Sequence, residues 1–166
     1  MNDTPSQGSG CALPRITVAS VVPDGDRFLF VEERVRGRRV INQPAGHREP
    51  NEQLTQAAVR ETLEDTGWHI ELTGLLAVYH WPDPPDRKPV LRFTFTGRAL
   101  DHDADRALDR GIIRALWLTA AELEQEAGRL RSPLVQRSLA DFQTRPLVPL
   151  SLIGSISAST APMTRP

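Results

Sequence analysis

The sequence has one cysteine, Cys11, among 166 residues, and its net charge is only −1 at neutral pH. A lone cysteine closes no internal disulfide and builds no tetrahedral zinc site, which favours a reducing compartment. The balanced charge argues against a nucleic-acid polymer or a membrane surface as the partner. No segment approaches the ~20 apolar residues of a membrane span, and residues 1–10 lack the pattern of a secretory signal. We therefore expect a cytoplasmic protein.

The chain length suits one domain with its own hydrophobic core. The composition, 39% hydrophobic and 25% charged, is typical of globular proteins. Both ends are rich in Ser, Thr, Pro and Gly. We therefore expect flexible segments at residues 1–14 and 154–166 around a folded domain at residues 15–153.

Short β-branched runs alternate with turn signals along the chain. They predict a hairpin of residues 16–22 and 28–33, a basic loop at 34–39, a strand at 40–42 and a turn at 44–46. Further strands are predicted at residues 75–81, 90–96 and 112–118, with a Pro/Asp-rich loop at 82–89.

The clearest helix signal covers residues 51–66, which contain no proline or glycine. Asn51 and Gly67 stand at the positions of its N-cap and C-cap. Helices are also predicted at 120–130 after Thr119, and at 133–142 after Ser132 with proline at the first position. Strands with one long central helix and two late helices predict a mixed α/β or α+β sandwich.

Three acids gather near the end of the central helix. Glu61, Glu64 and Asp65 are spaced i, i+3 and i+4, so they share one helical face. Their mutual repulsion calls for a positive group among them. Oxygen ligands suit Mg²⁺ or Mn²⁺ rather than zinc, and these cations complete their shell with phosphate oxygens. Arg60 could orient one acid or pair with Glu52, and the alternative for such spacing is a solvated acidic face.

The wider spacing closely resembles the Nudix box, the signature of Nudix hydrolases. Its matching positions are Gly46, Glu52, Arg60, Glu61, Glu64, Asp65 and Gly67. Thr62 and Trp68 stand where the family prefers aliphatic residues. Asp65 replaces the usual second glutamate and, being shorter, is a weaker candidate for metal contact than Glu61 or Glu64. Residues 42–47, 91–93 and 131–135 are similar to the NudJ phosphatase branch of the family, and that likeness covers most of residues 15–153.

This resemblance implies the Nudix fold, a mixed sheet sandwiched between helices, and Mg²⁺-dependent hydrolysis of a diphosphate linked to another group. The implied metal ligands are the Gly46 carbonyl, Glu61, Glu64 and Asp65, supported by Glu52, Arg60 and Gly67. The implied substrates are small phosphorylated metabolites: nucleoside di- and triphosphates or thiamine-pathway diphosphates. ADP-ribose or another nucleotide sugar is the alternative substrate, and a non-catalytic nucleotide-sensing module is the alternative of another class. The sequence leaves open whether the protein forms a homodimer.

The catalytic candidates are Glu61 and Glu64, with Glu61 a candidate general base. Many Nudix proteins add an acid from outside the box, and Asp109, just before the strand at 112–118, is our candidate against an ordinary turn residue. Five further residues are candidates for substrate binding, each with a plain structural alternative. They are Arg34 and Arg36 (or a solvated basic turn), His47 (or a loop hydrogen bond), Trp81 (or core packing) and Arg92 (or a solvent-facing strand residue).

Overall fold

The computed structural model describes residues 13–86 and 88–154 and contains two four-stranded sheets. The first sheet has the order β5 (Ala45–His47), β1 (Arg15–Val21), β7 (Val90–His102) and β6 (Trp68–Trp81). The second joins β2 (Pro23–Asp24), β3 (Arg27–Val35) and β4 (Arg38–Asn42), with β8 (Ile112–Thr119) paired to β3. Strands β1 and β7 run parallel while the other pairs are antiparallel. The predicted mixed sheet is thus confirmed.

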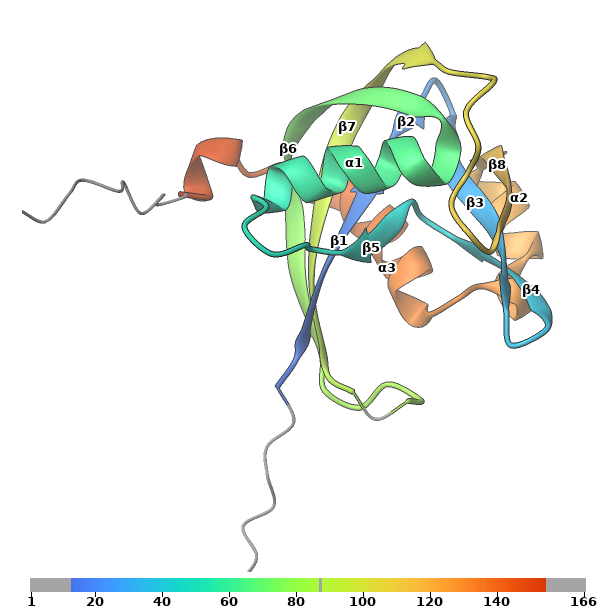
Figure 1. Cartoon of the computed structure of the whole chain (residues 1–166), viewed down its shortest axis with the longest axis horizontal. Coiled ribbons are helices and arrows are strands. Elements are labelled where there is room, and N and C mark those ends of the chain that lie inside the picture. The colour runs from blue at the N-terminus through green and yellow to red at the C-terminus, as the bar shows by residue number, and fades with distance from the viewer. Residues whose placement is uncertain (1–12, 87, 155–166) are drawn as a thin grey trace, which may run out of the picture.

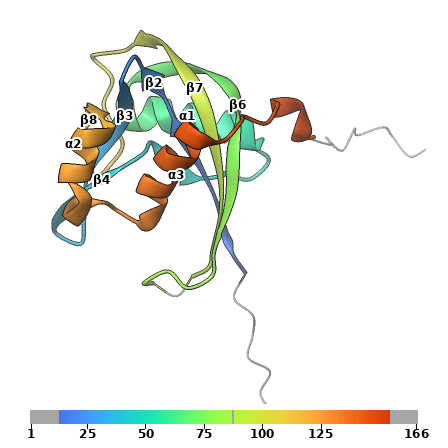
Figure 2. The ribbon, with the colours of Figure 1, turned by 180° about the vertical axis from the view of Figure 1, so that it is seen from behind.

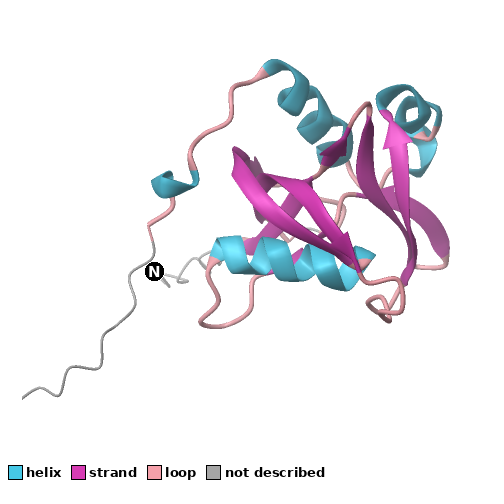
Figure 3. Cartoon of the chain, turned by 90° about the horizontal axis from the view of Figure 1, so that it is seen from above, coloured by secondary structure: helices cyan, strands magenta, loops and turns pink. Residues whose placement is uncertain are grey.

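The helices lie on both sides of the sheets (Figures 1 to 3). Helix α1 (Leu54–Thr66) covers one face of the first sheet and packs on Val18 and Phe95. Helices α2 (Ala120–Gln125) and α3 (Pro133–Thr144) lie on the other side, around a core that includes Phe30 and Leu76. This is the predicted sandwich. No helix within residues 13–86 and 88–154 has the length and hydrophobicity to span a bilayer.

The central helix starts later than predicted. Asn51 is not its N-cap, because its backbone is left-handed with φ of 62°. Gln53 is the N-cap and forms a capping box with Gln56. The predicted C-cap is confirmed, since Gly67 has φ of 73° and donates from its N–H to the Leu63 carbonyl. A side chain at Gly67 would meet the Asp103 carbonyl oxygen at 2.8 Å.

Three predictions about the first half of the chain are corrected. The predicted hairpin is formed by β2 and β3 only, since residues 15–21 join the first sheet and pair with β5 and β7. The predicted turn at 44–46 is wrong, because β5 forms there. The predicted basic loop is instead a tight hairpin in which only Arg36 and Gly37 turn, both at positive φ, as a two-residue type I′ connection requires.

The later elements follow the prediction with shifted ends. Strands β6 and β7 are longer than expected and form one antiparallel ribbon, with the chain reversing over the Pro/Asp-rich loop. Thr119 caps α2 through a capping box with Glu122. The helix predicted at 120–130 ends at Gln125, and a 3-10 turn follows at Ala127–Arg129, whereas α3 starts at Pro133 as predicted. A second 3-10 turn lies at Leu150–Leu152. The predicted flexible ends fall mainly on residues 1–12 and 155–166, outside the described residues.

Candidate active site

The predicted acids meet in one cavity of about 640 Å³. Glu61, Glu64 and Asp65 from α1 line it together with Gly46 of β5 and Asp109 from the segment before β8. The Asp109 N–H donates to the Glu64 carbonyl at 2.9 Å, which fixes this segment against the end of α1. The fold therefore brings Asp109 to the helical acids across more than forty residues of sequence.

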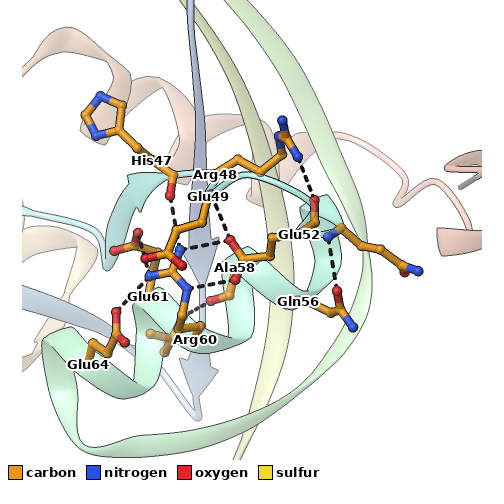
Figure 4. A network of polar contacts seen from close by, with 11 residues as sticks. His47, Arg48, Glu49, Glu52, Gln56, Ala58, Arg60, Glu61 and Glu64 are labelled. Atoms are coloured by element: carbon orange, nitrogen blue, oxygen red, sulfur yellow. Dashed lines mark hydrogen bonds and ion pairs between the residues drawn. The ribbon is translucent and has the colours of Figure 1, made fainter. Parts of the chain in front are cut away.

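Arg60 supplies the positive charge expected among these acids (Figure 4). Its Nε and Nη2 donate to the two carboxylate oxygens of Glu52 at 2.7 and 3.0 Å. Its Nη1 donates to Glu61 at 3.0 Å and to Glu64 at 2.8 Å. The hydrogen bonds with Glu52 raise the pKa of Arg60 and lower the pKa of Glu52. Both groups are therefore ionised at neutral pH, and the predicted pairing of Arg60 with Glu52 is present.

Glu61 and Asp65 are buried where charge is costly. Desolvation raises the pKa of Glu61, and the nearby Glu64 and Asp109 add to this rise while Arg60 opposes it. Desolvation also raises the pKa of Asp65 to about 8, although a hydrogen bond from Ala45 opposes the shift and the charge of Glu61 adds to it. Two buried carboxyl groups that repel each other bind a cation or protons more readily than exposed ones.

The absence of a side chain at Gly46 lets Glu61 approach β5. A β-carbon at this position would lie 2.0 Å from Glu61 Oε2, so no other residue fits without moving the carboxylate. The neighbouring Ala45 N–H donates to Asp65 Oδ2 at 3.0 Å and so points away from β1. Because the N–H and C=O of one strand residue point to the same side, the Ala45 carbonyl also points away from β1. Gly46 is instead aligned with Val18 of β1.

The donor chemistry fits a hard divalent cation. The side chains are carboxylates, and Arg60 bonds to only one oxygen each of Glu61 and Glu64 within residues 13–86 and 88–154. In the same residues, no three acidic, histidine or cysteine side chains lie close enough together to surround an ion. Glu61 and Glu64 each keep their second carboxylate oxygen free of Arg60, so these oxygens are the ones that would face a cation.

A second cavity, of about 330 Å³, adjoins the first. The two share five lining residues: Glu33, Asn42, Ala45, Gly46 and His47. Of the predicted substrate-binding residues, Arg36, His47, Trp81 and Arg92 line this second cavity, whereas Arg34 lines neither cavity and is aligned with Arg39 in the hairpin. Partial burial lowers the pKa of His47, and the charges of Arg15 and Arg92 lower it further.

Several lining residues were not among the predicted site residues. They include Thr17, Glu33, Asn42, Arg131 and Ser132. A signal for three of them was present, since the segments 42–47, 91–93 and 131–135 carry the likeness to one branch of the family. The structure places Asn42, Arg92, Arg131 and Ser132 from these separate segments around one cavity.

Comparisons with known proteins agree with this geometry. The NUDIX domain model matches residues 13–138. Phosphatase NudJ of Escherichia coli strain K12 is 38% identical over 144 residues, which cover 87% of this chain and 93% of that protein. A NUDIX hydrolase from Nitrosomonas europaea superposes with a TM-score of 0.86 at 39% identity, covering 89% of this chain and 100% of that chain.

A more distant structure shares the fold alone. A bifunctional NMN adenylyltransferase/ADP ribose pyrophosphatase from Francisella tularensis has a TM-score of 0.64 at 20% identity, covering 80% of this chain and 42% of that chain. The extent of the family match and the identity with Phosphatase NudJ are decisive. The chain belongs to the NUDIX domain family and is a hydrolase that acts on phosphorus-containing anhydrides.

Proposed function

We propose that this hydrolase is a Mg²⁺-dependent pyrophosphohydrolase for small phosphorylated metabolites, cleaving nucleoside di- or triphosphates or thiamine-pathway diphosphates. The observation that carries the proposal is the meeting of Glu61, Glu64 and Asp109 in one cavity, where a charged Arg60 pairs with Glu61 and Glu64. The likeness to Phosphatase NudJ over 87% of the chain supports a reaction that releases phosphate.

The residues that would hold Mg²⁺ are Glu61, Glu64 and Asp65, together with a backbone carbonyl of β5. The family pattern implies the Gly46 carbonyl for this role. The alternation of backbone groups along β5 instead favours the Ala45 carbonyl. Mn²⁺, another oxygen-preferring cation, would substitute. When bound, the cation supplies positive charge that offsets the phosphate oxygens.

The protein's own groups position the reactants and move the proton. Glu52 holds one edge of the Arg60 guanidinium through two hydrogen bonds, so the position of Arg60 does not depend on Glu61 or Glu64 alone. The raised pKa of Glu61 makes it a better proton acceptor for the attacking water than an exposed carboxylate. Asp109, in the same cavity, is the second candidate for this base.

A phosphate-release assay with Glu64→Gln tests the proposal, with Glu71→Gln as the matched control. Glu71 is an exposed glutamate on β6 that pairs with Arg98 and lines neither cavity. We expect Glu64→Gln to lose most activity while its circular dichroism spectrum and Tm stay close to those of the wild type. Near-normal turnover by folded Glu64→Gln would contradict the proposal.

A substrate panel with Mg²⁺ and with Mn²⁺ separates the alternatives. We expect the highest kcat/KM on nucleoside di- or triphosphates or on thiamine-type diphosphates. A clear preference for ADP-ribose would replace the proposed substrate class with a nucleotide sugar. Tight nucleotide binding without hydrolysis of any panel member would instead identify a nucleotide-sensing module.

A further inference from the structure

Arg92 of β7 has a guanidinium that is largely withdrawn from water inside the second cavity. Its Nε and Nη1 atoms are buried and have no hydrogen-bond acceptor among residues 13–86 and 88–154. Desolvation lowers the pKa of Arg92 to about 10, and the nearby charge of Arg131 contributes to this shift. The group is still cationic at neutral pH. A buried cation with unused donors destabilises the folded state unless an anion completes it.

The strand register places Arg92 in the middle of a polar row. On the face of the first sheet opposite α1, the four strands align His47, Thr17, Arg92 and Tyr79 side by side. Thr17 Oγ1 is buried and lacks a hydrogen-bond partner within the described ranges. Ser132 Oγ, in the cavity wall just before α3, is likewise buried and lacks a hydrogen-bond partner within these ranges. Two hydroxyl groups and a guanidinium with unused hydrogen-bonding capacity thus belong to residues that line one small cavity.

The charge of the cavity wall is positive. Four arginines line the cavity against two acids, namely Arg15, Arg36, Arg92 and Arg131 against Glu33 and Asp86. Asp86 is engaged by Arg15 at 2.9 Å. The Nε of Arg131 lies 3.7 Å from Glu33 Oε1, too far for a hydrogen bond. Glu33 Oε1 and Asn42 Oδ1 are acceptors that also lack a hydrogen-bond partner within the described ranges, so the excess in this cavity is one of positive charge.

We propose that this cavity is an oxyanion subsite in which the buried Arg92 binds a phosphoryl group of the substrate. The planar fork of arginine matches phosphate oxygens, and an anion beside Arg92 relieves its repulsion from Arg131. The inference rests on the proposed function, because the adjoining cavity is where the anhydride would be cleaved. The two cavities adjoin through five shared lining residues, as a substrate that occupies both requires. The volume of about 330 Å³ suits a small ligand.

Binding of inorganic phosphate to the metal-free protein tests the subsite directly. Isothermal titration calorimetry at constant ionic strength would compare the wild type with Arg92→Gln and Arg92→Lys. The matched control is Arg98→Gln, which removes an exposed arginine from the same strand. We expect phosphate affinity to fall roughly 10- to 100-fold in Arg92→Gln, less in Arg92→Lys, and not at all in the control. Unchanged affinity in folded Arg92→Gln would overturn the subsite.

Thermal unfolding of Arg92→Met gives a second readout, because a purely structural role of Arg92 predicts the opposite change in Tm. Methionine fills a similar apolar volume without the buried charge. We expect its Tm in phosphate-free buffer to equal or exceed that of the wild type, and the rise of Tm on adding phosphate to disappear. A lower Tm together with an undiminished phosphate effect would show that Arg92 serves the fold and not a ligand.

Hydrolysis by the same variants separates this inference from the proposed function. We expect Arg92→Gln to raise KM for the preferred substrate at least about tenfold and to weaken inhibition by phosphate equally, with kcat less affected. Normal kinetics and normal phosphate binding in Arg92→Gln would reject the subsite and leave the hydrolase proposal intact. Phosphate binding through Arg92 without hydrolysis of any panel substrate would reject that proposal and leave the subsite standing.

Discussion

Glu61 lies directly against Gly46, so that a β-carbon at position 46 would come within 2.0 Å of Glu61 Oε2. The carboxylate is the end of a flexible side chain, so Gly46→Ala should displace it rather than unfold β5. Because misplacement of a catalytic group by about 1 Å costs on the order of 100-fold, we expect a loss of kcat/KM of that size with a small change in Tm. Gly128→Ala is the control, since a β-carbon there meets no atom within 4 Å. Equal activity of both variants would contradict this role.

The affinity for Mg²⁺ should increase with pH. A metal ligand must lose its proton, and burial raises the pKa of Glu61 and brings that of Asp65 to about 8. Protons therefore compete with the cation at neutral pH, and this competition weakens as pH rises through about 8. Activity titrated with Mg²⁺ at several pH values should show a falling half-saturating concentration up to that pH. Asp65→Asn should bind Mg²⁺ more weakly and flatten the trend, and a pH-independent wild type would rule out this competition.

The acid face of α1 was predictable because its determinants are local. The i, i+3, i+4 spacing fixed which acids share a face, and Gly67 ended the helix through its left-handed backbone. The start of the helix was not predictable in this way, because it depends on contacts of a residue that precedes the helix. Glu52 is held outside α1 by its two bonds to Arg60 and by the Glu49 N–H, which moves the N-cap from Asn51 to Gln53. The contact of Glu52 with Arg60, eight residues later, thus outweighed the preference of asparagine for the N-cap position.

Strand pairing and the second cavity depended on contacts distant in sequence. The turn at residues 23–26 was correctly located, but β1 pairs with β7, over seventy residues later, instead of entering the hairpin. Alternation along β7 indicated which face Arg92 occupies, but not whether solvent or protein covers that face. The cover comes from the segment before α3, where the Arg131 N–H donates to the Ile41 carbonyl of β4 at 2.8 Å. Gln43, which follows β4, also donates to the Val135 carbonyl in the first turn of α3.

Glu32 should make the fold sensitive to acid. Its side chain is 3% exposed and accepts from Arg114 at 2.9 Å and from Arg129. Burial raises its pKa, but the hydrogen bonds with the two arginines outweigh burial and leave the pKa below its ordinary value. A carboxyl group with a depressed pKa stabilises the fold above its unfolded value of about 4.3, and this stabilisation disappears as pH falls through the folded value.

Urea unfolding of Glu32→Gln at neutral and acidic pH measures this contribution. We expect the variant to lose about 2 kcal/mol at neutral pH and to approach the wild type as the solution is acidified below the ordinary glutamate range. Glu124→Gln, an exposed change on α2, provides the control. A deficit that stays constant with pH would show that packing, and not ionisation, explains the loss.

Thr62 stands where the family prefers an aliphatic residue, and the structure supplies its partner. Its Oγ1 lies 2.9 Å from Ser20 Oγ and 2.8 Å from the Ala58 carbonyl oxygen, and both hydroxyl residues are fully buried.

Thr62→Val alone leaves Ser20 with only a 3.4 Å contact to the Ala58 carbonyl, so we expect the free energy of unfolding to fall by about 1 to 2 kcal/mol. Ser20→Ala alone strips Thr62 of one partner and should cost a similar or smaller amount. The double variant replaces the pair by apolar groups, so its cost should be at least about 0.5 kcal/mol below the sum of the single costs. Urea unfolding of the four proteins measures this coupling, and strict additivity would mean that β1 and α1 are held together here by packing alone.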